Sequence, residues 1–221
     1  MQEHLMRLIA KGISVYCPHT AMDAAVGGMN DWLCDILTDV DPRADGPKVA
    51  RNPIQPIQGP VPQGHEGAGY GRVMTLEPPI DLQELLDRLN TITPKSTKYG
   101  MVALPKKVRD SDLRNKKIGT VAVCVGSGAG VFGDNGAGAE LLVTGEMSHH
   151  DALRYTQLDR IVATVFHSNS ERGFLDGVLR KKLEARLRVP PFNQARVLVS
   201  KEDRDPFEIV SINENPPQKQ N

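Results

Sequence analysis

Residues 141–174 read LLVTGEMSHHDALRYTQLDRIVATVFHSNSERGF and contain two short apolar runs, each followed by a polar cluster. The runs at 141–143 and 161–166 have the continuous apolar character of strands that are buried on both faces. The polar clusters open helical patterns, and open α/β sheets bind ligands where helices start after strand ends. The stretch therefore predicts two adjacent strand-to-helix turns that deliver His149, His150, His167 and Glu171 to one site.

The second turn carries the sharpest chemical pattern, His167-Ser-Asn-Ser-Glu171. Residues four apart on a helix face the same way, so both side chains can point at one ion. Imidazole nitrogen and carboxylate oxygen are ordinary ligands of Zn, Mn and Fe. A structural alternative is that Ser168 or Ser170 caps the helix and Glu171 completes a capping box with Ser168.

The first turn, Ser148-His-His-Asp151, also sits at a helix start, where Ser148 and Asp151 form a capping box of their own. Adjacent helical residues point about 100° apart, so at most one of His149 and His150 easily faces a given ligand. The alternatives are that one histidine lines the site, or that one is packed and the other solvated.

Two further segments are candidates for the same site. His19-x3-Asp23 repeats the spacing of a histidine followed by a carboxylate after an apolar run, although Asp23 also suits an Asx-type turn. Gly126-Ser-Gly-Ala-Gly130 follows a buried run and can either cradle an anion or form a tight turn. It is neither GxGxxG nor a Walker loop.

Apolar runs alternate with helical patterns along most of the chain, which predicts an α/β fold with a mixed, mainly parallel sheet flanked by helices. The expected helices are 2–11, 30–37, 81–89, 148–157 and 170–188. The expected strands are 13–18, 69–76, 101–104, 118–125, 140–143, 160–166, 196–200 and, at an edge, 207–212.

Residues 39–69 are rich in proline and glycine and poor in large apolar residues, which predicts a long mobile loop. Residues 213–221 are polar and predict a disordered tail. The remaining pattern is that of a single α/β domain over residues 1–212.

Composition excludes several classes of protein. The 221 residues are 39% hydrophobic and 24% charged with a net charge of zero, so no global field favours direct nucleic-acid binding or an anionic membrane. No apolar run approaches the ~18 residues of a transmembrane helix. The three cysteines show no CxxC spacing, and Cys17 and Cys124 lie in apolar runs that predict burial. A reduced intracellular compartment is expected.

Six longer motifs recur in the pattern of one known family. They begin at residues 17, 67, 123, 144, 167 and 203 and read CPHTAMDAAVGGMNDWL, GAGYGR, VCVGSG, TGEMSHHDAL, HSNSERGFL and DRDPFEIV. Together they resemble the NIF3 family, also described as GTP cyclohydrolase I type 2 homologues. The resemblance extends from residue 1 to about residue 212.

The resemblance implies a ring-shaped homo-oligomer, often a hexamer, around a two-metal site. The family's aspartate, late histidine and glutamate ligands match Asp23, His167 and Glu171. His149 and His150 belong to a family signature that lines the site. The family's histidine pair lies upstream of the segment that resembles residues 1–11, so the resemblance also implies a chain that lacks its N-terminal portion and part of the metal centre.

Two functions are therefore expected. One is a hydrolase of the GTP cyclohydrolase I type 2 kind, dependent on a divalent metal (Zn, Mn or Fe), in which His149, His150 or Glu146 carries protons. The other is a non-enzymatic oligomeric scaffold that binds a transcriptional adaptor protein. The expected location is cytoplasmic, with the nucleus or mitochondrion as alternatives.

Overall fold

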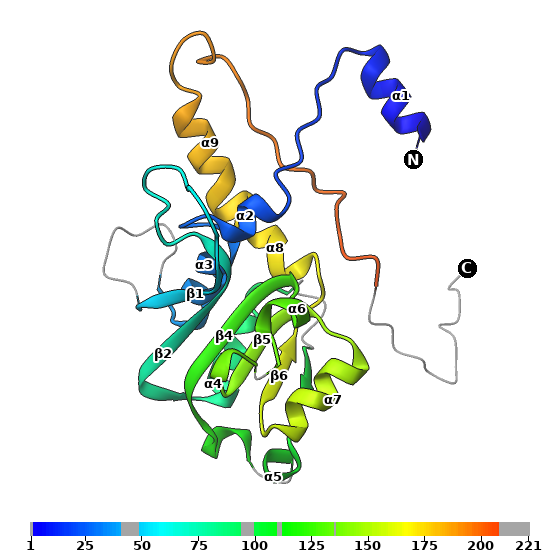
Figure 1. The fold of residues 1–221 in the computed structure, drawn as a ribbon. Helices are drawn as coiled ribbons and strands as arrows, with labels where there is room; N and C mark the ends of the chain where they lie inside the picture. The colour runs from blue at the N-terminus through cyan, green and yellow to red at the C-terminus, as the bar shows by residue number, and fades with distance from the viewer. Residues whose placement is uncertain (1, 41–48, 94–99, 110–111, 135, 208–221) are drawn as a thin grey trace, which may run out of the picture.

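A computed structural model describes residues 2–40, 49–93, 100–109, 112–134 and 136–207 (Figure 1). Its centre is one six-stranded sheet with the order β1-β2-β4-β5-β6-β3. The strands are β1 (Arg51–Pro56), β2 (Gly69–Asp81), β3 (Met101–Ala103), β4 (Lys117–Ser127), β5 (Leu141–Glu146) and β6 (Ile161–Thr164).

The sheet is mixed, as predicted, but it is not mainly parallel. Only β4 with β5 and β5 with β6 pair in parallel, whereas the other three pairings are antiparallel. A parallel pair needs a crossover connection, and helix α7 supplies one between β5 and β6. A continuous apolar run indicates that both faces of a strand are buried, but it does not indicate whether the strand runs parallel or antiparallel to its neighbours. The prediction of a mainly parallel sheet was wrong for this reason.

Alternate residues of the central strands face two separate cores. In β5, Leu141 and Val143 join the larger core, and Leu142 joins the smaller one. The same alternation holds in β4, where Val123 and Cys124 point to opposite faces. Both faces of these strands are therefore covered, as their continuous apolar runs predict.

Helices cover the two faces of the sheet (Figure 1). The α-helices are α1 (Gln2–Ala10), α2 (Thr20–Ala24), α3 (Met29–Leu37), α4 (Leu82–Leu89), α5 (Lys106–Arg109), α6 (Ala129–Phe132), α7 (His149–Gln157), α8 (Asn169–Phe174) and α9 (Arg180–Arg186). Side chains of α3, α4 and α8 contribute to the larger core, and Phe132 of α6 and Tyr155 of α7 contribute to the smaller one.

The predicted helix over 170–188 starts one residue earlier than expected and is interrupted. A π-helical turn, Leu175–Leu179, joins α8 to α9. Two short 3₁₀ turns, Leu113–Asn115 and Gly136–Gly138, complete the helical elements of the described residues.

The predicted loop over 39–69 contains a strand, so this prediction is wrong in part. β1 pairs antiparallel with β2 at the edge of the sheet, with Pro53 opposite Arg72 and Pro56 opposite Gly69. Proline lacks an N–H donor but is tolerated in edge strands, so a proline-rich segment can still form a strand at the edge of a sheet. The proline content of 39–69 therefore wrongly indicated a loop at the position of β1. Residues 41–48 lie outside the described residues.

Two predicted strands, at 13–18 and 196–200, do not form. Both segments lie in stretches without helix or strand, and Val15, Tyr16 and Leu198 are exposed. Cys17 is exposed as well, contrary to the prediction, whereas Cys124 is buried. A short apolar run becomes a strand only where a neighbouring strand pairs with it. Residues 208–221 lie outside the described residues, so the edge strand, the tail and the single domain over 1–212 stay predictions.

The helix predicted at 2–11 forms as α1, but none of its residues is buried. Figure 1 shows α1 away from the sheet, at the end of an extended segment. The chain after α9, residues 187–207, has no regular secondary structure and leaves Phe192 and Phe207 exposed. Within the described residues, no helix has the length and apolar character needed to cross a membrane.

Candidate metal centre

A cavity of about 300 Å³ opens where β4 ends, between α2 and the start of α8. It brings together side chains from distant parts of the sequence. They are His19, Thr20, Asp23, Met29, Tyr70, Cys124, Val125, Gly126, Ser127, Val131, His167 and Glu171. The three residues predicted as metal ligands, Asp23, His167 and Glu171, thus line one cavity.

His167 lies between two carboxylates. Its Nδ1 is 2.8 Å from Oε1 of Glu146, and its Nε2 is 3.4 Å from Oε1 of Glu171. The hydrogen bond with Glu146 raises the pKa of His167, and the nearby Glu171 charge adds to that effect. Since Glu146 ends β5 and His167 follows β6, the two strand-to-helix turns do meet at one site.

Gly126 lets these side chains approach the end of β4. Its φ of +66° is in the left-handed region, and a Cβ built there would lie 2.9 Å from Oε1 of Glu171 and 3.0 Å from Nε2 of His167. Its N–H donates to Ser170 Oγ at 2.8 Å, while Ser170 Oγ donates to the His167 carbonyl at 2.6 Å. Ser170 therefore joins the strand end to the first turn of α8.

The capping-box alternative for Glu171 does not form. Ser168 occupies the N-cap position of α8 without a side-chain capping bond, and its own N–H donates to Asp205 Oδ2 at 3.0 Å. A carboxylate 37 residues further along the chain, that of Asp205, thus accepts from the backbone at the start of α8. The Glu171 carboxylate lines the cavity instead of capping the helix, and its burial there raises the pKa of Glu171.

Asp23 reaches the cavity from α2. Burial raises its pKa, although the nearby His19 and His167 act in the opposite direction. Its Oδ1 is fully buried and has no hydrogen-bond partner in the described structure. A buried carboxylate oxygen without a donor is costly, and a bound cation would remove that cost.

His149 and His150 do not line this cavity. Both are exposed at the start of α7, with ring centroids 5.5 Å apart. The predicted Ser148 cap is confirmed, because Ser148 Oγ accepts from the Asp151 N–H at 3.2 Å. The return bond of the predicted capping box differs, since the Asp151 carboxylate accepts from the Ser148 hydroxyl at 2.6 Å. Within one chain, Glu146 therefore contacts His167, whereas His149 and His150 lie away from the cavity.

Two amides of the glycine-rich turn after β4 already have hydrogen-bond partners and are not available to an anion. The N–H groups of Gly126 and Gly128 donate to Ser170 and Thr144 hydroxyls. The tight-turn alternative is therefore the correct one for these two glycines. The acidic side chains around the cavity also favour a cation over an anion.

Comparison with known proteins agrees with these motifs. The sequence model of the family Duf34/NIF3 (NGG1p interacting factor 3) matches residues 1–206. The chain belongs to the Duf34/NIF3 family. It is 36% identical over 209 residues to NGG1-interacting factor 3 of Saccharomyces cerevisiae, which covers 94% of this chain and 66% of the yeast protein. The chain thus spans about two thirds of that relative's length.

A bacterial relative of this NIF3 protein is the GTP cyclohydrolase 1 type 2 homolog of Clostridium perfringens. The two are 29% identical over 208 residues, which cover 93% of this chain and 68% of the other. Among solved structures, a Bacillus cereus protein related to NIF3 superposes with a TM-score of 0.65 at 18% identity. The match covers 94% of this chain and 76% of that one and supports the fold.

The cavity of this NIF3 chain suits a divalent cation in its donor types, two carboxylates and one imidazole. The orphaned Oδ1 of Asp23 and the raised pKa values of Asp23 and Glu171 show where positive charge would be favourable. Within the described residues, no group of three or more His, Cys, Asp or Glu side chains is arranged so that it could hold a metal ion. The three residues predicted as ligands therefore line one cavity, but their side chains do not converge on a common point as they are placed here.

Two lining residues, Tyr70 and Cys124, were not predicted as site residues, although they lie in the NIF3-like motifs that begin at residues 67 and 123. Tyr70 comes from β2 and Cys124 from β4, and burial raises the pKa of the Cys124 thiol to about 12. His19, whose spacing from Asp23 marked it as a candidate, also lines the cavity, with φ +43°, an uncommon conformation for histidine. The usable signal for Tyr70 and Cys124 was their place in these motifs, since neither belongs to a pair of histidine and carboxylate.

Proposed function

We propose that this chain binds a divalent cation through Asp23, His167 and Glu171 and serves a metal-dependent hydrolase of the GTP cyclohydrolase 1 type 2 kind. The observation that carries the proposal is the buried, unpartnered Oδ1 of Asp23 in the cavity that His167 and Glu171 also line. The name of the Clostridium perfringens relative supports the reaction class.

A bound Zn²⁺, Mn²⁺ or Fe²⁺ would polarise a substrate oxygen and lower the pKa of water. The chain's own residues have distinct roles in the proposal. Glu146, 2.8 Å from Nδ1 of His167, would keep the ring proton on that nitrogen, so that the lone pair of Nε2 would bind the cation. The apolar wall formed by Met29, Tyr70 and Val131 excludes water from one side of the substrate.

His149 and His150 remain candidates for proton transfer. Because they lie outside the cavity of their own chain, this role requires them to approach a cavity from a neighbouring copy in a homo-oligomeric ring. Loss of turnover in His149→Ala or His150→Ala, with unchanged metal content, would support the role.

Metal analysis tests the main proposal. The purified chain is expected to contain up to one Zn, Mn or Fe per molecule and to gain thermal stability when Mn²⁺ or Zn²⁺ is added. His167→Ala and Glu171→Ala should abolish both effects, and His4→Ala, an exposed histidine on α1, should retain them. Metal-free protein with no thermal shift would refute the proposal.

A second candidate function is an oligomeric scaffold that binds a transcriptional adaptor protein. Two observations favour it: the name of the Saccharomyces cerevisiae relative, and the exposed apolar residues of α1 and of residues 187–207. A partner that is captured equally well by the natural chain and by His167→Ala would support this function. A metal-dependent activity lost in His167→Ala would favour the hydrolase.

A further inference from the structure

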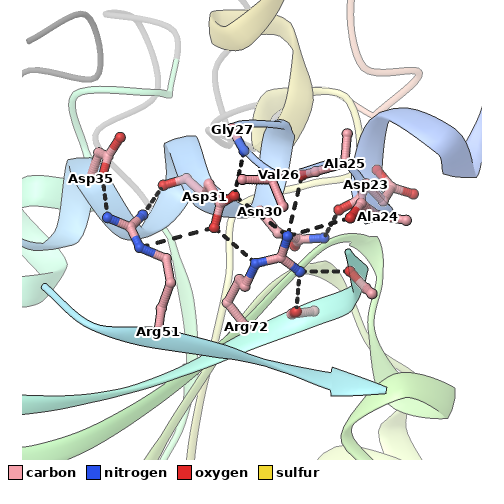
Figure 2. Close-up of polar contacts among 12 residues, drawn as sticks. Asp23, Ala24, Ala25, Val26, Gly27, Asn30, Asp31, Asp35, Arg51 and Arg72 are labelled. Atoms are coloured by element: carbon pink, nitrogen blue, oxygen red, sulfur yellow. Dashed lines mark hydrogen bonds and ion pairs between the residues drawn. The ribbon is translucent and has the colours of Figure 1, made fainter. Parts of the chain in front are cut away.

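Helix α2, which carries Asp23, has only five residues, and helices this short are not stable by themselves. The last carbonyl groups of a helix also lack partners within the helix. In this chain three successive carbonyls, those of Asp23, Ala24 and Ala25, accept hydrogen bonds from the side chains of Asn30 and Arg72 (Figure 2). The orientation of Asp23 therefore depends on side chains outside its own helix.

Asn30 is completely buried at the start of α3 and makes two bonds in opposite directions. Its Nδ2 donates to the Asp23 carbonyl at 3.0 Å, and its Oδ1 accepts from the Val125 N–H at 2.9 Å. Val125 precedes Gly126, and the side chains of His167 and Glu171 pack against the Cα of that glycine. One amide thus connects the backbone of Asp23 to the strand end beneath the other two proposed ligands.

Arg72 is buried, and each nitrogen of its guanidinium group donates hydrogen bonds to the protein. Its side chain is only 2% exposed, and its Nε donates to Asp31 Oδ1 at 2.8 Å. Its Nη1 donates to the carbonyls of Gly69 at 2.6 Å and Gly71 at 2.8 Å, which leaves Nη2 to meet Ala24 and Ala25. Arg72 is therefore a rigid support for the chain just after Asp23.

We propose that Asn30, supported by Arg72, is a positioning residue that sets the Asp23 carboxylate against His167 and Glu171. This inference rests on the proposed metal function. One partner of Asn30 is the carbonyl of Asp23 itself, and the other is the N–H of Val125, which precedes Gly126, so a displaced Asn30 would shift both sides of the proposed site. A partner that orients a ligand typically changes metal affinity by about 10–100-fold when it is lost.

The decisive variant is Asn30→Asp, which keeps the shape of the side chain but replaces the donor to the Asp23 carbonyl with an oxygen. Mn²⁺ affinity, measured from the EPR signal of free Mn²⁺ below the unfolding temperature, is expected to fall at least ~10-fold. An added negative charge near the site would by itself strengthen cation binding, so a loss reports displacement of Asp23.

Asn30→Ser provides a second variant without a buried charge, in case Asn30→Asp does not fold, and the same loss is expected. Asp35→Asn is the matched control. Asp35 is 1% exposed, accepts from Arg51 at 2.6 Å and lies on the far side of Asp31 from Asp23 (Figure 2). Asp35→Asn should lower Tm, whereas its Mn²⁺ affinity should stay within about twofold of that of the natural chain. A positioning role for Asn30 requires this difference between the two variants.

Natural Mn²⁺ affinity in a folded Asn30 variant would overturn the positioning role and leave the proposed function intact. A loss in Asp35→Asn as large as in the Asn30 variants would also overturn it, since general destabilisation would then explain both. Failure of the natural chain to bind Mn²⁺ would instead remove the proposed function and this inference together.

Discussion

The Nδ1 atom of His167 and Oε1 of Glu146 lie 2.8 Å apart, although 21 residues separate them in sequence. Glu146 ends β5, and His167 follows the neighbouring strand β6. Parallel pairing of these strands brings both carboxyl ends to one edge, where the contact forms. The hydrogen bond fixes the ring so that Nε2 faces the cavity, which is the arrangement that metal-binding histidines usually have.

Glu146→Gln should weaken divalent-metal binding by about tenfold, because a neutral amide supports the imidazole less well than a carboxylate does. The same change should lower the pKa of His167, since the hydrogen bond to Glu146 is the main cause of its elevation. Mn²⁺ titration and NMR titration of the His167 ring measure the two effects. Glu184→Gln, on exposed α9, should change neither; an unaltered His167 pKa in Glu146→Gln would contradict the assignment.

Asp23→Asn should stabilise the metal-free protein at neutral pH. Burial raises the pKa of Asp23, so the folded state binds this proton more tightly than the unfolded chain does, and the ionised carboxylate destabilises the fold above the raised pKa. After allowance for screening at this partly exposed site, the gain is on the order of 1 kcal/mol, or ~2–4 °C in Tm.

The gain from Asp23→Asn should shrink as the pH falls through the raised pKa towards the ordinary value of 3.8, because the natural carboxyl then becomes neutral as well. Thermal unfolding in the presence of a chelator, at a series of pH values, measures this dependence. A lower Tm for the variant at neutral pH would show that the carboxylate is stabilised by its surroundings.

Gly126→Ala should damage the candidate site and the fold together. The new methyl group would meet Glu171 and His167 at about 3 Å, and a φ of +66° is strained for alanine. We expect a loss of stability of about 1 kcal/mol or more and weaker Mn²⁺ binding. Gly130→Ala is the matched control, because a Cβ there meets nothing within 4 Å. Equal Mn²⁺ affinities in the two variants would argue against a site beside Gly126.

Charged substitutions on α1 should reduce self-association, if the exposed apolar face of this helix packs against another copy. Leu5 is 52% exposed and Ile9 is 62% exposed, and both lie on one face. Light scattering of Leu5→Glu/Ile9→Glu is expected to give a smaller assembly than the natural chain. Arg7→Glu, on the opposite face, should keep the natural mass; an unchanged mass in the double variant would leave α1 without a role in assembly.

Much of the fold was predictable where local pattern and tertiary pairing agree. The central strands and α7 follow from buried apolar runs and from the Ser148 cap, both of which are local. Strand direction and edge pairing were not predictable, because β1 contains prolines and the runs at 13–18 and 196–200 are apolar without a pairing partner. Those outcomes depend on which segments meet, and local composition does not contain that information.

The sequence by itself determined the family, through its long motifs, and the α/β character, through its alternating apolar runs and helical patterns. The proposed ligands Asp23, His167 and Glu171 follow from the resemblance to that family, and the spacing of His167 and Glu171 agrees with it. Only the tertiary structure decided that Asp23, His167 and Glu171 share one cavity with Cys124 and Tyr70, and that His149 and His150 stay outside it. It also placed Asn30 between Asp23 and the end of β4. Contacts between residues this far apart arise from strand pairing and helix packing, which spacing along the chain does not encode.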